Sequence, residues 1–329
     1  MSSRIIYMGT PNFAVPAMER VALGDSGDLA LVVTQPDRAA GRGRKHVAPA
    51  VKTAAERLGV PVLQTATLRD PEVRQRIIDI RPDLIIVAAF GMILGRWILE
   101  LPARGCVNLH ASLLPKYRGA NPIAAAIAQG EEVTGVSLMQ MDRGLDTGGV
   151  YATTEIDIEL DDTTESVTQK LANRAGMLLE DNVSALLDGS LLPVPQGEGA
   201  TLTRQMTKAD GWLDFVRPAV EMERHIRATW PWPRAWTTDP AGERIQVHAA
   251  SVSDEFALHP GQIAHADGQV VVGTGRGSLI LRRVQLPGGR PIDDSAIMQV
   301  RSLSDGQVLG VVDRPEDLPP LVIPVPNDG

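Results

Sequence analysis

The sequence predicts an α/β protein in which an N-terminal, doubly wound and mostly parallel sheet is followed by a small C-terminal β-barrel. Two observations lead to this prediction. Short apolar, β-branched runs alternate with helix-length segments from the N-terminus, a pattern typical of a parallel sheet with helices on both faces. Near the C-terminus the pattern changes to short alternating runs separated by glycine turns, which favours a small barrel or sandwich.

The N-terminal part is expected to contain four buried strands and three helices. The strands are predicted over Arg4–Met8, Ala30–Thr34, Leu84–Ala88 and Val107–His110. The helices between them are predicted over Val15–Leu23, Ala48–Leu58 and Pro71–Ile80. In such sheets ligands bind beyond the carboxyl ends of the strands. We therefore expect a site near Gly9-Thr10-Pro11, Phe90-Gly91 and His110.

A long helical pattern, with Thr163 as its N-cap, ends before Asp188-Gly189 and is expected to close the first domain. The Pro- and Gly-rich segment that follows has no periodicity, as expected of a linker. This predicts a first domain over 1–189, a linker over 190–206 and a C-terminal domain over 207–329. The end of this last domain is a Pro-rich tail, which is expected to be extended or disordered. That last domain should hold one helix, Ala219–Thr229, and strands over Ile245–Ala249, Gln262–Ala264, Gln269–Val272 and Leu279–Gln285.

Composition narrows the class of protein. The chain has 329 residues, a net charge of −8 and one cysteine, which excludes an internal disulfide framework and a cysteine-rich metal site. No apolar run approaches the roughly 20 residues of a membrane span, and we expect a cytoplasmic protein. The segment from Gln35 to Lys52 is locally basic. It could meet phosphate or be a solvated loop, and charge alone leaves both possibilities open.

Candidate chemistry lies between Cys106 and Pro122, where Asn108, His110 and Ser112 occupy alternate positions. On an extended strand, alternate side chains share a face. Asp146 follows a strand-like run in a glycine-flanked turn, which is a typical setting for a carboxylate that meets a histidine from elsewhere. An amide, an imidazole and a carboxylate are sufficient for acyl-group chemistry.

Two mechanisms fit these residues. Ser112 could be a nucleophile activated by His110, as in a hydrolase, or two bound substrates could react directly. Ser112 lies in A-S-L-L-P rather than in a G-x-S-x-G elbow, so we prefer direct transfer. The sequence also lacks a G-x-G-x-x-G turn, a P-loop and closely spaced histidine pairs, which argues against a dinucleotide, a P-loop nucleotide or a metal.

Longer motifs resemble one family, the methionyl-tRNA formyltransferases. They are GTPNF, TQPDRAAGRGRK, VAAFG, NLHASLLPKYRGANPI, TGVSLMQMDRGLDTG and PWPRAW. The resemblance implies a formyltransferase-type, Rossmann-like N-terminal domain and an OB-like C-terminal barrel that binds tRNA. It also implies formyl transfer from 10-formyltetrahydrofolate to the α-amino group of methionyl initiator tRNA, for translation initiation. We expect a monomer that needs no metal and no membrane.

The resemblance also implies roles for individual residues. Catalysis is assigned to Asn108, His110 and Asp146. Folate contacts are expected from Ser112, Leu113, Leu114 and Pro115, with a cis bond before Pro115, and from Phe90, Gly91, Ile93 and Asp142. On the tRNA side, Arg42 should enter the acceptor end, while phosphates should be held by Arg38, Arg44 and Lys45.

Two departures from the family and several rival activities bear on this interpretation. From Thr207 onward acidic residues outnumber basic ones, although a tRNA-binding barrel should have a basic face. Phe90 replaces a common tyrosine. Rival enzymes of the folate family formylate a nucleotide sugar or glycinamide ribonucleotide and would not need the basic segment. The sequence is also compatible with a folate hydrolase and with a non-catalytic tRNA-binding module.

Overall fold

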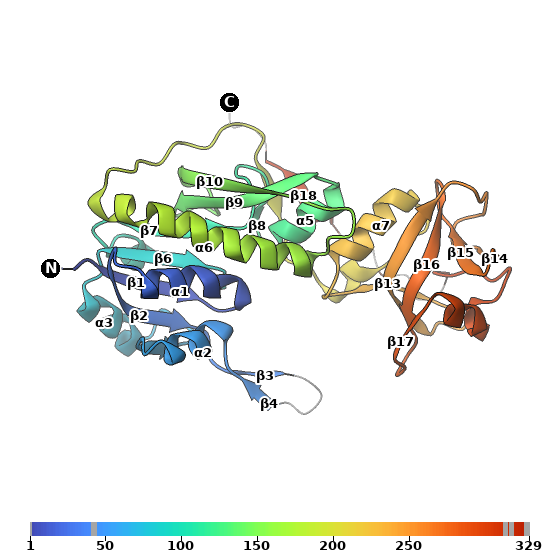
Figure 1. Cartoon of the computed structure of the whole chain (residues 1–329), viewed down its shortest axis with the longest axis horizontal. Coiled ribbons are helices and arrows are strands. Elements are labelled where there is room, and N and C mark those ends of the chain that lie inside the picture. The colour runs from blue at the N-terminus through green and yellow to red at the C-terminus, as the bar shows by residue number, and fades with distance from the viewer. Residues whose placement is uncertain (1, 41–44, 312–314, 316–318, 326–329) are drawn as a thin grey trace.

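A seven-stranded sheet forms the centre of the N-terminal part of this computed structural model, which describes residues 2–40, 45–311, 315 and 319–325 (Figure 1). Its strand order is β10 (Val150–Asp157), β9 (Val133–Gln140), β7 (Cys106–His110), β6 (Leu84–Ala88), β1 (Arg4–Gly9), β2 (Asp28–Thr34) and β5 (Val62–Gln64). The five strands from β7 to β5 run parallel, whereas β9 runs antiparallel to both of its neighbours, β7 and β10. The predicted mostly parallel sheet is confirmed.

Helices cover both faces of this sheet, which explains why β1 is a continuous apolar run. On one face Ile5 and Tyr7 join the core formed with α1 (Val15–Leu23), α2 (Ala50–Arg57) and α6 (Thr164–Asp188). On the other face Ile6 and Met8 pack in a core with α3 (Pro71–Ile80) and α4 (Arg96–Leu99). All four strand side chains are fully buried.

The connections from β1 run in two directions. The chain passes from β1 to β2 and β5 on one side, whereas β6 and β7 lie on the other. The direction of winding therefore reverses between β1 and β6, and ligands of open α/β sheets bind at such a reversal. Gly9, Ala88 and His110 end β1, β6 and β7 at this edge.

The segment after α6 runs back along the N-terminal sheet. Thr163 caps α6 as predicted, since its side chain accepts the N–H of Ser166. Val194 then pairs with Val150 of β10. Further along, β11 (Thr201–Thr203) lies between β8 (Arg118–Gly119) and β18 (Val322–Pro324). The predicted linker and the Pro-rich tail therefore each supply a strand. The sequence did not predict these strands, because their pairing depends on partners that are distant in sequence.

The C-terminal part is a small all-β domain entered through α7 (Ala219–Ala228). Its antiparallel sheet runs β12 (Ala235–Thr238), β13 (Arg244–Ser253), β16 (Ser278–Gln285), β15 (Gln269–Gly273) and β14 (Ile263–Ala266), with β17 (Pro291–Asp293) paired to β16. Helix α7 packs against α5 (Pro122–Gln129) of the N-terminal part. Figure 1 shows the β-domain beyond these two helices.

Smaller elements complete the fold. The basic segment contributes a hairpin, β3 (Arg38–Ala40) and β4 (Lys45–Val47), which projects from the N-terminal sheet in Figure 1. Short 3₁₀ helices span Asn12–Ala14, Lys208–Gly211, Asp294–Gln299 and Arg301–Leu303. None of the helices in the described part of the chain is both long and apolar enough to cross a bilayer.

Candidate active site

Strand β7 brings Asn108 and His110 to the carboxyl end of the parallel strands, close to the point where the direction of winding reverses. The two side chains share a face because they lie two positions apart on an extended strand. Asn108 is flanked by Val87 of β6 and Met139 of β9, and it is half-buried. Among the described residues its side-chain amide has no hydrogen-bond partner, so the amide is available to a ligand.

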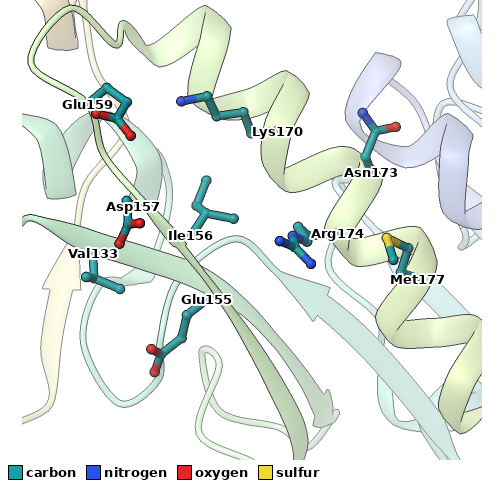
Figure 2. Close-up of a pocket in the computed structure, with 9 residues that line it drawn as sticks. All are labelled: Val133, Glu155, Ile156, Asp157, Glu159, Lys170, Asn173, Arg174 and Met177. Atoms are coloured by element: carbon teal, nitrogen blue, oxygen red, sulfur yellow. The ribbon is translucent and has the colours of Figure 1, made fainter.

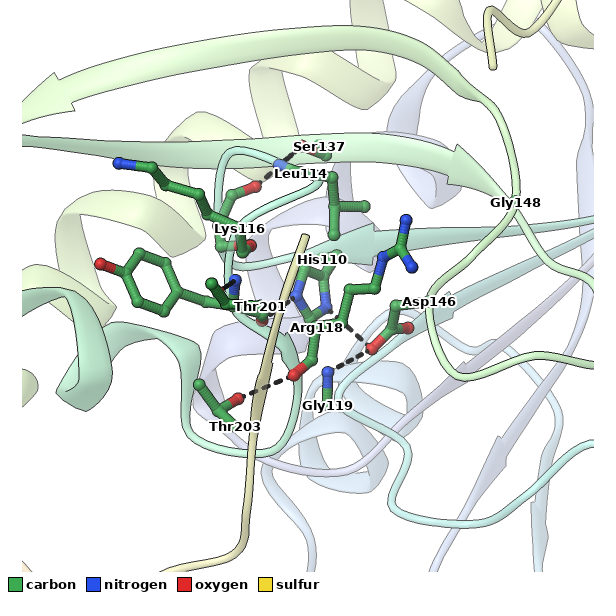
Figure 3. A network of polar contacts seen from close by, with 12 residues as sticks. His110, Leu114, Lys116, Arg118, Gly119, Ser137, Asp146, Gly148, Thr201 and Thr203 are labelled. Carbon is green, nitrogen blue, oxygen red and sulfur yellow. Dashed lines mark hydrogen bonds and ion pairs between the residues drawn. The ribbon is translucent and has the colours of Figure 1, made fainter. Parts of the chain in front are cut away.

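His110 is fixed by a backbone carbonyl. Its Nε2 atom lies 2.9 Å from the carbonyl oxygen of Tyr117. Because a carbonyl oxygen only accepts, the proton of a neutral ring is placed on Nε2. The Nδ1 atom then lies 3.6 Å from Oδ2 of Asp146 (Figure 3). The sequence prediction that Asp146 meets His110 agrees with this geometry.

Asp146 is held by the backbone of a neighbouring strand. The N–H of Gly119 on β8 donates to Asp146 Oδ2 at 2.8 Å. Asp146 itself has a φ of 53°, a left-handed conformation that is uncommon for residues other than glycine. The turn before it is closed by Asp142, whose carboxylate accepts from the Gly144 N–H and from Thr147 Oγ1 at 2.9 and 2.7 Å. Asp142 therefore shapes the turn that carries Asp146.

Ser112 does not act as a free hydroxyl. Its Oγ donates to the carbonyl oxygen of Lys116 at 2.7 Å, and the residue is 0% exposed. Ser137 of β9 closes the same loop, donating to Ser112 O and accepting from Leu114 N. The Leu114–Pro115 bond is cis, as predicted. The geometry gives no support to Ser112 as a nucleophile.

The loop after β6 is tied to β2. The carbonyl oxygen of Phe90 accepts from Gln35 Nε2 at 2.8 Å and from Thr10 Oγ1 at 3.1 Å. Both lone pairs of that oxygen are used, so a bound pterin would have to contact other backbone groups of this loop. Gly91 has a φ of 77°, and a Cβ there would lie 2.6 Å from Gln35 Nε2. Ile93 is 95% exposed at the end of this loop.

Two of the other predicted folate residues border a hollow of about 330 Å³. Leu113 and Pro115 line it together with Tyr117 and Thr134. The hydroxyl of Tyr117 donates to Glu131 Oε1 at 2.6 Å, and burial together with this carboxylate raises the pKa of the tyrosine. Leu114 does not line the hollow; its N–H is bonded to Ser137 instead.

The predicted tRNA residues are placed only in part. Arg38 begins β3, and its guanidinium donates to Gln35 Oε1. Lys45 begins β4, but its side chain is not among the described parts of the structure. Arg42 and Arg44 lie outside the described residues. The hairpin stem is anchored through Asp37, which accepts from Gln64 Nε2 at 2.7 Å and from Lys52 Nζ at 3.1 Å.

Another groove lies away from these residues. It has a volume of about 480 Å³ and runs between α6 and the strands β9 and β10 (Figure 2). Lys170 and Arg174 of the helix face Glu155 and Asp157 of the strand across it. No residue with a predicted role lines this groove. Within the described residues, no three His, Cys, Asp or Glu side chains are grouped to hold a metal.

Cys106 and three histidines of the C-terminal part are held by burial or by hydrogen bonds. Cys106 is buried, its thiol contacts the carbonyl oxygen of Ile98 at 3.3 Å, and burial raises its pKa to about 12. In the C-terminal part, burial lowers the pKa of His225 and of His248 to about 4. His265 Nε2 contacts the carbonyl oxygen of Leu303.

Comparison with known proteins identifies the family. A family model described as formyl transferase matches residues 3–183, and one described as the formyl transferase C-terminal domain matches residues 205–302. Over 304 residues the chain is 44% identical to the methionyl-tRNA formyltransferase of Myxococcus xanthus, with 92% of this chain and 96% of that protein covered. The chain belongs to the methionyl-tRNA formyltransferase family. The family named from the sequence is thus confirmed.

Further relatives agree. The Streptomyces coelicolor methionyl-tRNA formyltransferase is 40% identical, with 93% of this chain and 99% of that protein covered. Among solved structures, an N-formyltransferase from Helicobacter canadensis in complex with folinic acid and dTDP-3-aminofucose has a TM-score of 0.63 at 17% identity, with 85% of this chain and 99% of that chain covered. HypX from Aquifex aeolicus in complex with tetrahydrofolic acid has a TM-score of 0.59 at 16% identity, with 91% of this chain and 47% of that chain covered. At these identities the likeness concerns the fold alone.

Sequence reasoning missed three contributors to the site of this family member. Tyr117 supplies the carbonyl that orients His110, and Gly119 supplies the N–H that holds Asp146. Gln196, within the predicted linker, contacts the Asp146 turn. Two of the three act through the backbone, which no side-chain pattern encodes.

Proposed function

We propose that this protein transfers the formyl group of 10-formyltetrahydrofolate to the α-amino group of methionyl initiator tRNA by direct attack. The observation that carries the proposal is the pairing of His110 with Asp146 at the end of β7, beside the free amide of Asn108. The relatives named methionyl-tRNA formyltransferase cover more than nine-tenths of the chain. Their name supports methionyl-tRNA as the acceptor.

The acceptor needs little activation. An α-amino group has a pKa near 8 in model compounds, so a usable fraction is a neutral nucleophile at neutral pH. Positioning the amine against the formyl carbon then makes the reaction effectively unimolecular. Ser112 is not required as a covalent carrier, which fits its hydrogen bond to Lys116 O.

Attack of the nitrogen on the formyl carbon produces a tetrahedral oxyanion. We assign the Asn108 amide N–H to that oxygen, together with the positive charge of a protonated His110 ring, because such groups stabilise negative charge most strongly in a water-poor site. Asp146 orients the imidazole and takes up the amine proton through water. As the oxyanion collapses to the formamide, the carbon–nitrogen bond to the folate breaks, and the leaving nitrogen receives through water the proton that Asp146 took from the amine.

Folate and tRNA are assigned to separate surfaces. For the folate we propose Ser112–Pro115, the loop Phe90–Ile93 and the turn that contains Asp142. For the tRNA we propose the β3–β4 hairpin, with Arg42 at the acceptor end and with phosphates held by Arg38, Arg44 and Lys45. Residues 207–329 would provide further tRNA contacts. Because translation initiation takes place there, we propose a cytoplasmic location.

Because the proposed catalytic residues all come from one chain, we propose that a monomer is active. We also propose that no metal takes part in the reaction. The assay mixes purified protein, 10-formyltetrahydrofolate and methionine-charged initiator or elongator tRNA, and measures formyl-methionine after mild deacylation. Preferential formylation of the initiator is expected. Formylation of a nucleotide sugar or of glycinamide ribonucleotide in place of methionyl-tRNA would refute the acceptor, and release of formate without an acceptor product would indicate a hydrolase.

A further inference from the structure

Gln196 joins the segment after α6 to the turn that carries Asp146. Its Nε2 donates to the carbonyl oxygens of Asp146 and Gly148, at 2.8 and 2.7 Å. Its Oε1 accepts from Nε and Nη2 of Arg118, at 3.1 and 2.8 Å. An amide has two N–H donors and two oxygen lone pairs. Every hydrogen-bonding group of this side chain is therefore used within the site.

The backbone that carries Gln196 is fixed on both sides. Before it, Val194 exchanges two backbone hydrogen bonds with Val150, at 2.8 and 2.9 Å. After it, Thr201 accepts the N–H of Tyr117 through its hydroxyl at 2.7 Å. The segment is thus attached to β10 and to the loop whose carbonyl orients His110. A side chain on such an anchored backbone can position a neighbour with little freedom of its own.

The Asp146 turn needs this support. Asp146 has left-handed backbone angles, which cost free energy and persist only where surrounding contacts determine them. The two carbonyls that Gln196 binds belong to Asp146 and to the residue two positions later. The same amide fixes Arg118, which directly precedes the Gly119 whose N–H holds the Asp146 carboxylate. Both supports of the carboxylate therefore meet at one side chain.

We propose that Gln196 is a positioning residue for formyl transfer: it sets the Asp146 carboxylate against His110 without touching either substrate. This inference rests on the function proposed above. A displacement of about 1 Å in a reacting group typically costs on the order of a hundredfold in rate. Loss of Gln196 should therefore lower kcat while both substrates still bind.

The test compares Gln196→Ala and Gln196→Glu with Leu192→Ala, a control in the same segment whose side chain is exposed. We expect Gln196→Ala to lower kcat by about tenfold to a hundredfold, with KM for folate and tRNA close to wild type. Gln196→Glu keeps the oxygen acceptors for Arg118 but loses both N–H donors, so its kcat should fall as far as that of Gln196→Ala. Amide hydrogen exchange across 142–148 should quicken in both variants and stay unchanged in the control.

Results that contradict the positioning role of Gln196 can be distinguished from results that contradict the proposed function. Gln196→Ala with the control's kcat, or Gln196→Glu with wild-type kcat, would overturn the positioning role. Equal loss of melting temperature and activity, with unchanged kcat per folded molecule, would reduce Gln196 to a structural residue and overturn it as well. A wild-type protein that formylates no tRNA would refute the proposed function, and hydrogen exchange would still decide whether Gln196 holds the turn.

Discussion

Oδ2 of Asp146 lies 3.6 Å from Nδ1 of His110 and accepts the N–H of Gly119 at 2.8 Å. The carboxylate is thus directed at the imidazole by a backbone group, while the far side of the ring is fixed by the carbonyl of Tyr117. A proton on Nδ1 would lie between the ring and the carboxylate. Neutralising the carboxylate tests that arrangement.

Asp146→Asn should lower the single-turnover rate by about a hundredfold to ten-thousandfold, the range usual for general acid–base groups. The asparagine oxygen can still accept the Gly119 N–H, so the turn is expected to persist, but the neutral amide cannot take up a proton. Rapid-quench formylation under saturating substrates gives the rate. Asp157→Asn, an exposed change on β10, is the control, and equal rates in the two variants would contradict the assignment.

Ser112→Ala distinguishes a loop hydroxyl from a nucleophile. Removing the hydrogen bond to Lys116 O should cost about 1 kcal/mol of stability and raise KM for the folate. The chemical rate should remain within about tenfold of wild type, because positioning rather than covalent catalysis is affected. Urea unfolding and single-turnover kinetics measure the two effects. Complete loss of turnover in a folded variant would favour the serine mechanism.

Gly91→Ala should destabilise the protein more than Gly59→Ala does. Both glycines have positive φ, 77° and 72°, which costs an alanine about 1–2 kcal/mol. Only at Gly91 would the added Cβ also meet a neighbour, Gln35 Nε2 at 2.6 Å, whereas Gly59 has open space. Urea unfolding compares the two variants. Gln35→Ala should relieve part of the Gly91→Ala penalty, and additivity of the two changes would contradict the steric explanation.

Acid should destabilise the C-terminal domain through His225. Burial lowers its pKa from 6.5 to about 4 in the folded state, so at pH above 6.5 the residue is neutral in both states and contributes nothing to the pH dependence. Between pH 6.5 and 4 only the unfolded chain gains the proton, and stability falls as pH falls, by up to about 1.4 kcal/mol per pH unit. His225→Gln should flatten this slope in urea titrations, unlike His259→Gln at an exposed position. An unchanged slope in His225→Gln would place the protonation elsewhere.

Arg42→Ala should impair the choice of tRNA more than the binding of folate. The arginine is assigned to the acceptor end of the initiator, where the unpaired first position is easier to open. The ratio of kcat/KM for initiator over elongator methionyl-tRNA should fall, while KM for the folate changes little. A wild-type ratio in this variant would remove Arg42 from recognition.

Local signals predicted the N-terminal elements closely. The helices Val15–Leu23 and Pro71–Ile80 have the predicted limits, because a proline lies at the start of each and Asp70 caps the second through its side chain. The strand carrying Asn108 and His110 was also predicted, since a buried parallel strand is a continuous apolar run. Its polar residues then stand out as exceptions, and such exceptions mark sites.

Long-range pairing was not predictable from local pattern. The three residues of β11 are too few for periodicity, and their partners Arg118 and Val322 lie far away in sequence. Gln196 contacts a residue 50 positions earlier and carries no motif of its own. For the same reason the basic segment was open to two interpretations, while the structure describes its stem as a hairpin held through Gln35 and Asp37.

The path of the chain after α6 bears on how the protein can be divided. A fragment that stops at Gly189 would retain Asn108, His110 and Asp146, yet it would lack both Gln196 and the strand that covers β8. Such a fragment would contain the catalytic side chains but would lack the segment that positions them. The two halves of this enzyme are therefore not interchangeable modules: any exchange of the C-terminal half between relatives must leave residues 190–203 with the N-terminal half.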